Sequence, residues 1–199
     1  FIYIILFLIV GIISSCSTKK DTFANRAFHN VTSYYNGYWN ARNILNLAVK
    51  DMQDQAIDNF YEIPPLIYYG DAKVAQNIKP ELDNAIEKSH LVIKKHSMLI
   101  KHKERVKWID DLYFVIGKSY FYEHEYTNAR RTFQHILKSF PQKNIQNSAN
   151  LWLAKTYIQI GDFEKAQAAL EGLQKKVEKF EVSRAVQKEY PIARAELYL

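Results

Sequence analysis

The chain has 199 residues, 48% of them hydrophobic and 14% aromatic, so it can bury one sizeable core or a short stack of repeats and is not a disordered tail. Its formal net charge of +6 is spread along the sequence without a Gly- or Arg-rich aromatic motif, which argues against a nucleic-acid partner. The six Gly and five Pro are few, which favours helices over sheet hairpins, and the single Cys excludes a disulfide within the chain.

Residues 1–15 are predicted to be a lipoprotein signal peptide. Nearly all of residues 1–13 are large and apolar. As a helix they would span about 20 Å, short of the roughly 30 Å hydrocarbon core of a bilayer, so a cleaved signal suits them better than a membrane-spanning helix. The alternative is an uncleaved anchor.

The run ISSC at residues 13–16 resembles the lipobox of bacterial lipoproteins, in which an aliphatic and two small residues precede a cysteine. The resemblance implies that Cys16 accepts a diacylglyceryl group and that residues 16–22 form a lipidated leader. Stable anchoring takes more than one acyl chain. Because Ser17 and Thr18 stand where an aspartate would favour the inner membrane, we expect an anchor in the outer membrane. A signal-like helix followed by a cysteine by chance is the alternative.

Residues 23–109 are expected to form a helical region that is only partly repeat-like. Asn36 and Gly37 indicate a break between two helical stretches. The second stretch, YWNARNILNLA at 38–48, has apolar residues at helical spacing and matches only the second-helix half of the repeat described below.

Two adjacent prolines and a Tyr-Gly-Asp step in YEIPPLIYYGDAKVAQNIKP, residues 61–80, indicate an extended connection. Pro80 fits the first turn of a new helix. The spacing of apolar residues extends that helix from Glu81 to about Ile100.

Two charged segments could bind a partner, although a solvated helix face accounts for each more simply. The first is an acidic stripe for a cation or a basic partner: Asp51, Asp54, Asp58 and Glu62. The second is residues 88–107, whose target could be acidic phospholipid headgroups or a negatively charged protein. Its three histidines, His90, His96 and His102, are six apart and point away from one another on a helix, which disfavours a metal site.

A pattern recurs after 37 positions. It pairs Tyr120 with Tyr157, Tyr126 with Phe163, Ala129 with Ala166, Phe133 with Leu170 and Ile136 with Leu173. The first copy resembles a tetratricopeptide repeat in the spacing of Tyr113, Ile116, Gly117, Tyr120, Ala129, Phe133 and Pro141. We therefore predict an all-α solenoid of stacked helical hairpins, with repeats at 110–143 and 147–180 and the start of a further helix or repeat at 181–199.

Stacked hairpins leave one side of their first helices lining a concave groove. By the resemblance, the groove positions for a partner are Asp111, Phe114, Lys118, Phe121, Tyr122, Ser148, Leu151, Lys155, Ile158 and Gln159. Lys118 and Lys155 also recur after 37 positions, so they would stand side by side. They could contact an acidic or carboxylate-bearing segment of a partner, or simply be solvated.

Three longer stretches carry a more specific resemblance: CSTKKDTFANRAFHNVTSYYNGYWNAR, PELDNAIEKSHLVIKKHSMLI and KWIDDLYFVIGKSYFYEHEYTNARRTF. Between Cys16 and at least Phe133, the chain resembles the amino-terminal region of the tetratricopeptide lipoproteins of Bacteroidota of the PorW or SprE type. The resemblance implies a lipoprotein on the periplasmic face of the outer membrane that type IX protein secretion and gliding motility require. Its protein partners would be components of the secretion machinery. Members of that family are several times longer, and ARAELYL reads as a running helix, so we expect a longer protein.

No motif of a phosphate-binding loop, a dinucleotide site, a serine hydrolase or a zinc protease is present in the sequence. The adjacent Asp110 and Asp111 would diverge by about 100° on a helix, which makes a poor acid–base pair. A lipidated Cys16 could not act as a nucleophile. We expect a scaffold for protein partners and no enzyme, cofactor, metal, small-molecule substrate or nucleic acid. A repeat lipoprotein for outer-membrane protein assembly or envelope maintenance is the alternative function.

Overall fold

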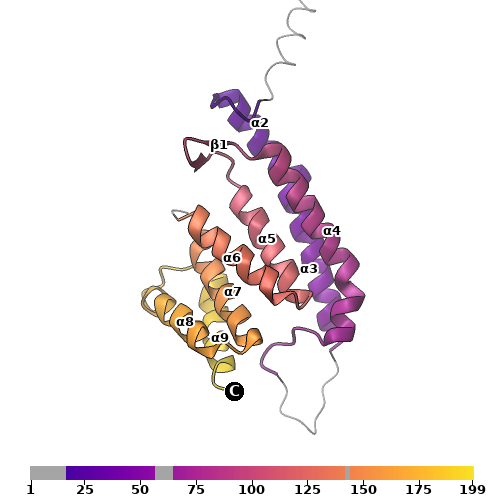
Figure 1. The fold of residues 1–199 in the computed structure, drawn as a ribbon, viewed down its shortest axis with the longest axis vertical. Coiled ribbons are helices and arrows are strands. Elements are labelled where there is room, and N and C mark those ends of the chain that lie inside the picture. The colour runs from indigo at the N-terminus through magenta and orange to yellow at the C-terminus, as the bar shows by residue number, and fades with distance from the viewer. Residues whose placement is uncertain (1–16, 57–64, 142–143) are drawn as a thin grey trace, which may run out of the picture.

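The computed structural model describes residues 17–56, 65–141 and 144–199, and nearly all of their regular structure is helical (Figure 1). The predicted signal peptide and Cys16 lie outside the described residues, as do Asp58 and Glu62 of the acidic stripe. The helices are α2 (Phe23–Ser33), the π-helical turn η1 (Tyr34–Tyr38), α3 (Trp39–Asp54), α4 (Ala72–His96), α5 (Ile109–Tyr122), α6 (Tyr126–Ser139), α7 (Ile145–Ile160), α8 (Phe163–Glu178) and α9 (Arg184–Glu196). The strands β1 (Leu99–Ile100) and β2 (Lys103–Glu104) form a short antiparallel hairpin.

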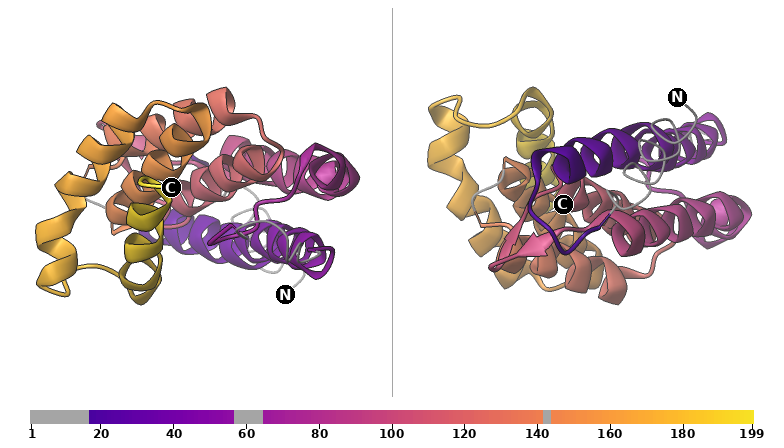
Figure 2. Two further views of the ribbon diagram at one scale, coloured as in Figure 1. Left: turned by 90° about the horizontal axis from the view of Figure 1, so that it is seen from below. Right: turned by 90° about the horizontal axis from the view of Figure 1, so that it is seen from above.

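Consecutive helices pack as hairpins. The helix α3 packs on α4, α5 on α6 and α7 on α8, and α4 and α6 join each hairpin to the next. On one side of this stack, α3, α5, α7 and α9 are successive neighbours. Figure 2 shows α3 and α4 at one side of the molecule and α8 and α9 at the other. The predicted all-α solenoid of helical hairpins is confirmed, while the boundaries assigned to each repeat stay a prediction.

The core is largely one cluster of buried side chains that runs from α3 to α8, and a second cluster joins α7, α8 and α9. Close packing within the first cluster depends on Gly117 of α5. A Cβ atom at this position would lie 2.6 Å from Cε1 of Phe133 on α6. Because Phe133 is fully buried, only a residue without a side chain lets the two helices approach this closely.

The predicted helix break at Asn36 and Gly37 is wrong, because the chain stays helical from α2 through η1 into α3. In the wider turn of η1, Gly37 packs against α4, and a Cβ there would lie 2.5 Å from Cγ2 of Val92. This glycine therefore serves a close contact between helices, which the sequence does not distinguish from a helix break.

The predicted extended connection up to residue 80 and the helix start at Pro80 are also wrong, because α4 begins at Ala72 and contains Pro80. The carboxylate of Asp71 caps the helix by accepting a hydrogen bond from the backbone N–H of Val74 at 2.8 Å. The buried stripe of α4 then runs through the proline without interruption; it includes Val74, Ala75, Ile78, Leu82 and Ala85. Burial along this stripe outweighs the backbone hydrogen bond that a proline removes.

The helix also ends earlier than predicted, at His96, because the hairpin of β1 and β2 follows. The carboxylate of Glu104 holds this hairpin by accepting hydrogen bonds from the backbone N–H groups of Met98 and Val106, both at 2.9 Å. Lys101 and His102 make the turn in the left-handed region, at φ of 51° and 61°. None of the helices in the described ranges is long and apolar enough to cross a membrane.

Candidate functional site

A cleft of about 470 Å³ lies on the side of the solenoid that α3, α5, α7 and α9 share. The four helices contribute Arg42 from α3, Lys118 from α5, Trp152 from α7 and Glu189 from α9, among others. The cleft is therefore built by every second helix between α3 and α9, and its walls carry both charged and apolar side chains.

The indole ring of Trp152 in the cleft wall contacts two ammonium groups, that of Lys118 at the cleft and that of the buried Lys155. Nζ of Lys118 lies 4.5 Å from the ring centroid of Trp152, and Nζ of Lys155 lies 4.6 Å from it. The face of an aromatic ring attracts cations at such distances. Trp152 is held in place by Phe121, whose ring packs against it edge-on at 5.2 Å between centroids.

Lys155 is only 2% exposed and forms an ion pair with the last helix. Its Nζ donates a hydrogen bond to Oε2 of Glu189 at 2.6 Å. A buried ammonium group without a partner would cost several kcal/mol. The carboxylate from α9 therefore offsets part of the cost of burying the Lys155 ammonium group.

Lys118 has a different environment. Burial lowers the pKa of its ammonium group from the ordinary 10.5 to about 8. The positive charges of Lys155 and Arg42 lower this pKa further, while the charge of Glu189 opposes the change. Among the described residues, Glu189 forms its ion pair with Lys155 and not with Lys118. Glu189 therefore compensates the charge of Lys155 more fully than that of Lys118, and an anion that enters the cleft would stabilise the charged form of Lys118.

The ten predicted groove positions are divided between three environments. Five line the cleft: Asp111, Phe114, Lys118, Ser148 and Leu151. Phe121, Tyr122 and Lys155 are buried beneath it. Ile158 and Gln159 lie in a separate hollow of about 600 Å³ beside residues 65–71 and the end of α9. Their role in binding a partner stays a prediction.

The groove is divided because the segment between α3 and α4 covers one end of it. Tyr69 packs edge-on against Phe121, with 5.0 Å between ring centroids. Its hydroxyl donates a hydrogen bond to Oε2 of Glu196 on α9 at 3.1 Å. The spacing of repeats contains no information about such a crossing segment, so the sequence predicted one continuous groove.

Sequence reasoning also missed the contribution of α3. Residues 38–48 were predicted to match the second helix of a repeat, and this is wrong. The first helices of the hairpins line the cleft, and α3 is one of them, because it lies beside α5 and supplies Arg42 and Leu45 to the cleft. Trp152 and Glu189 were missed as well. The recurrence of Lys118 and Lys155 was the signal that pointed to their neighbourhood.

The other charged candidates lie away from the cleft. Asp51 and Asp54 are exposed on α3, where Asp54 pairs with Lys50 of the same helix. His96 has its Nδ1 atom 2.9 Å from Nδ1 of His29 on α2. Within the described part of the chain, no group of three or more His, Cys, Asp or Glu side chains could hold a metal ion.

The fold and the cleft define a helical-repeat protein whose concave side can receive a ligand. The tetratricopeptide repeat family matches residues 120–188, a stretch that begins in α5 and ends in α9. No curated protein matches the chain. Residues 120–188 are therefore similar to tetratricopeptide repeats, whose stacked helix pairs form extended concave surfaces for binding other proteins.

Proposed function

We propose that this chain is a periplasmic scaffold, anchored in the outer membrane through Cys16, that binds protein partners in type IX secretion and gliding motility. The proposal is supported by the lipobox at residues 13–16 and by the resemblance of residues 16–133 to lipoproteins of the PorW or SprE type. The tetratricopeptide repeats supply the scaffold, and the protein has no catalytic role of its own.

The observation that carries the binding function is the pair of ammonium groups on Trp152. The carboxylate of Glu189 already compensates Lys155, whereas burial destabilises the charge of Lys118. A carboxylate from a partner would complete the same arrangement at Lys118. We therefore infer that the ligand of this cleft is a segment of a partner protein that carries a carboxylate.

A deletion strain tests the cellular role. Loss of the protein should stop secretion of cargo that bears the type IX carboxyl-terminal signal, and the wild-type gene should restore it. Normal cargo secretion would contradict the proposal. A broad loss of outer-membrane barrels with normal cargo secretion would instead support the alternative function in outer-membrane assembly.

Radioactive palmitate labelling tests the anchor independently. Wild type should be labelled and Cys16→Ala should not, because the alanine offers no thiol for the diacylglyceryl group. Equal labelling of the two proteins would rule out lipidation at this residue.

Site-specific photocrosslinking tests the cleft. Arg42 is the best position for the crosslinker because it is exposed at the cleft, whereas Lys155 is buried. We expect crosslinks to components of the secretion machinery from Arg42 and none from Lys175, an exposed control on α8. The variant Lys118→Gln should abolish the crosslinks. Unchanged crosslinks in this variant would refute the cleft as the binding site.

A further inference from the structure

The first described helix, α2, is packed with its polar side inward. Asn25, His29 and Ser33, which are four positions apart, are each at most 3% exposed. Phe23 and Val31 on another side of the helix are 81% and 58% exposed. A helix on the surface of a soluble protein normally buries its apolar side, whereas Phe23 and Val31 of α2 are largely exposed among the described residues.

Hydrogen bonds explain why the polar side faces inward. The Nδ2 group of Asn25 donates to the backbone carbonyls of Ser17 and Lys20, both at 2.9 Å. His29 lies against His96 of α4, and the hydroxyl of Ser33 donates to the carbonyl of Asn30 at 3.2 Å. The contact of His29 with His96 therefore holds the polar side of α2 against α4, and Phe23 and Val31 on the other side stay exposed.

The same end of the molecule collects positive charge. Both α2 and the turn before it contact the segment after α4: the backbone N–H of Lys107 donates to Oδ1 of Asn30 on α2 at 2.8 Å, and Arg105 pairs with Asp21, which precedes α2, at 3.1 Å. We call residues 17–35 and 94–108 the basic end. It contains nine Lys and Arg against two Asp and Glu, a net charge of +7 that exceeds the +6 of the whole chain.

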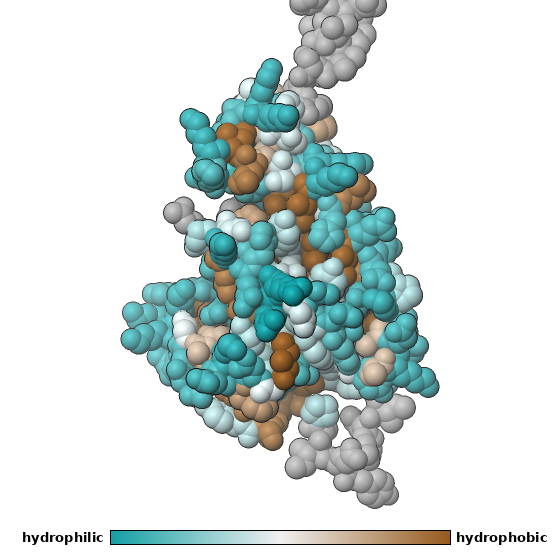
Figure 3. Space-filling model, viewed as in Figure 1, coloured by the Kyte–Doolittle hydropathy of each residue, from teal (hydrophilic) through white to brown (hydrophobic). Residues whose placement is uncertain are grey.

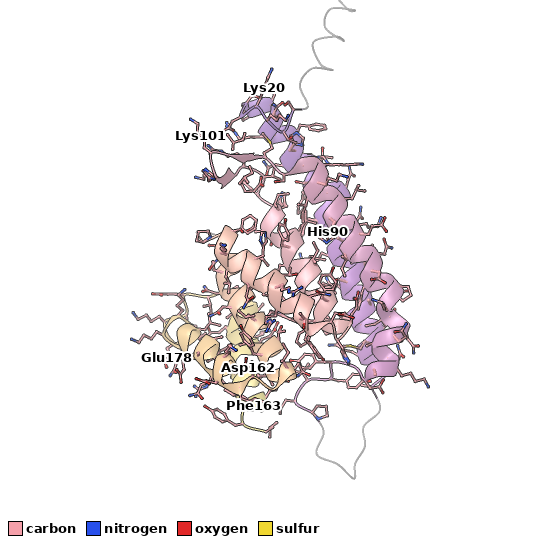
Figure 4. The ribbon with its side chains drawn as sticks, viewed as in Figure 1. Lys20, His90, Lys101, Asp162, Phe163 and Glu178 are labelled. Carbon is pink, nitrogen blue, oxygen red and sulfur yellow. The ribbon has the colours of Figure 1, made fainter. Side chains whose placement is uncertain are left out.

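The two acidic groups of the basic end are already engaged. Asp21 pairs with Arg26 at 2.6 Å as well as with Arg105, and Glu104 accepts hydrogen bonds inside the β-hairpin. The lysines of the basic end remain exposed: Lys19, Lys20, Lys94, Lys95, Lys101, Lys103 and Lys107. Figure 4 shows Lys20 and Lys101 at the same end of the molecule, far from Phe163 and Glu178.

Exposed apolar side chains lie between these lysines. Leu99 of the hairpin is 68% exposed, and Phe23 and Val31 line a shallow hollow together with Arg26 and Lys107. Figure 3 shows apolar residues among hydrophilic ones at this end. Such a combination is typical of surfaces that lie in the headgroup region of an anionic membrane.

We propose that the basic end lies against an anionic lipid surface, with Phe23, Val31 and Leu99 inserted between headgroups and the lysines bound to lipid phosphates. The position of the chain agrees with this occupant, because Ser17, held to α2 by Asn25, directly follows Cys16. Which membrane supplies this lipid surface rests on the proposed function, in which Cys16 anchors the chain in the outer membrane. An acidic protein would satisfy the lysines but would leave the apolar side of α2 without an apolar partner.

Vesicle binding by a chain without the lipid tests the inference separately from the anchor. The segment from Ser17 to Leu199 contains every residue of the two buried clusters, so it carries the core of the described fold. We expect this segment to cosediment with vesicles of phosphatidylglycerol and phosphatidylcholine, and not with phosphatidylcholine alone. Added salt should weaken the binding. A lack of preference for the anionic vesicles would overturn the inference, whatever palmitate labelling shows for Cys16.

Two matched triple variants test the location of the surface. The combination Lys101→Gln, Lys103→Gln and Lys107→Gln should weaken binding about 100-fold, because each lysine near an anionic surface contributes roughly a fivefold increase in affinity. The combination Lys175→Gln, Lys179→Gln and Lys188→Gln removes the same charge from exposed positions of α8 and α9 and their link, and should leave binding close to wild type. Equal losses in both variants would contradict a localised site.

An apolar substitution separates a lipid surface from a general polyanion site. The variant Phe23→Ser should weaken vesicle binding several-fold without changing its salt dependence, whereas Phe163→Ser, at an exposed position of α8, should have no effect. Circular dichroism of each variant checks that the fold is retained. If polyglutamate competes fully with the vesicles and Phe23→Ser binds like wild type, the basic end recognises acidic chains and the lipid proposal is wrong.

Discussion

Lys118 and Lys155 are 37 positions apart in sequence, and their ammonium groups lie 4.5 Å and 4.6 Å from the centroid of the same indole ring, that of Trp152. The positive charge of Lys155 repels that of Lys118, which adds to the effect of burial in lowering the pKa of Lys118. The face of Trp152 and the carboxylate of Glu189 offset part of this repulsion. The charges of the two lysines are therefore only partly compensated, and the effect of each charge on the free energy of unfolding can be measured.

Removal of the compensating carboxylate should destabilise the fold. We expect Glu189→Gln to lower the free energy of unfolding by about 2 kcal/mol, because it leaves the buried ammonium group of Lys155 without a charged partner. Urea denaturation measures the change. The double variant Lys155→Met with Glu189→Gln should recover most of the loss, since it removes both charges. A single variant as stable as wild type would show that the pair contributes nothing.

Alkaline pH should stabilise the protein through Lys118. Its pKa is about 8 in the folded state and 10.5 ordinarily, so between these values the unfolded chain binds a proton that the folded chain does not. The free energy of unfolding should therefore rise with pH across this window, by up to about 3 kcal/mol, and be unaffected by this group below pH 8. Urea denaturation at pH 8 and 10.5 should show a smaller rise for Lys118→Met, and an identical rise would contradict the lowered pKa.

A methyl group at the helix crossing should be costly. Gly117→Ala places a Cβ 2.6 Å from the buried ring of Phe133, so we expect a loss of about 1–2 kcal/mol in spite of the better helix propensity of alanine. Gly172→Ala on α8 is the matched control, since its nearest neighbour would be 3.8 Å away. The control should gain roughly 0.5–1 kcal/mol. Thermal unfolding compares the two variants, and a stabilised Gly117→Ala would refute the close approach.

Mild acid should weaken the contact between α2 and α4. Burial lowers the pKa values of His29 and His96 below the ordinary 6.5, and the charge of Lys95 lowers that of His96 further. Below pH 6.5 the unfolded chain therefore binds more protons at these rings, and stability should fall as the pH falls. In addition, a hydrogen bond between the two Nδ1 atoms needs one of them to be unprotonated.

Substitution of both rings provides the measurement. The double variant His29→Gln with His96→Gln should lose most of the acid dependence in urea denaturation, whereas His102→Asn, at an exposed position of the hairpin turn, should keep it. Asparagine suits the left-handed backbone at residue 102, so this control adds no strain. An unchanged acid dependence in the double variant would exclude the pair as its source.

Local patterns were sufficient to predict the helical hairpins. Small residues such as Gly117 and Ala129 and large ones such as Phe133 stand at the spacing of a helical hairpin, and packing between consecutive helices depends on such short-range spacings. The same patterns predicted the start of α4 wrongly. Pro80 is typical of a helix start, but α4 begins at Ala72 because the buried stripe continues on both sides of the proline. Gly37 was misjudged for a similar reason, since its contact is with Val92, far away in sequence.

The sequence by itself determined the all-α class, the hairpin repeats and the recurrence of two lysines, because all three follow from spacing along one chain. Only the tertiary structure decided that Trp152 and Glu189 meet these lysines, that Tyr69 closes one end of the groove, and that α2 and residues 94–108 form one basic end. In the sequence the positive charge is dispersed, and folding concentrates it by joining two distant segments. The burial of a side chain and the charges around it depend on which segments pack together. These segments are distant in sequence, so local sequence patterns do not predict their contacts.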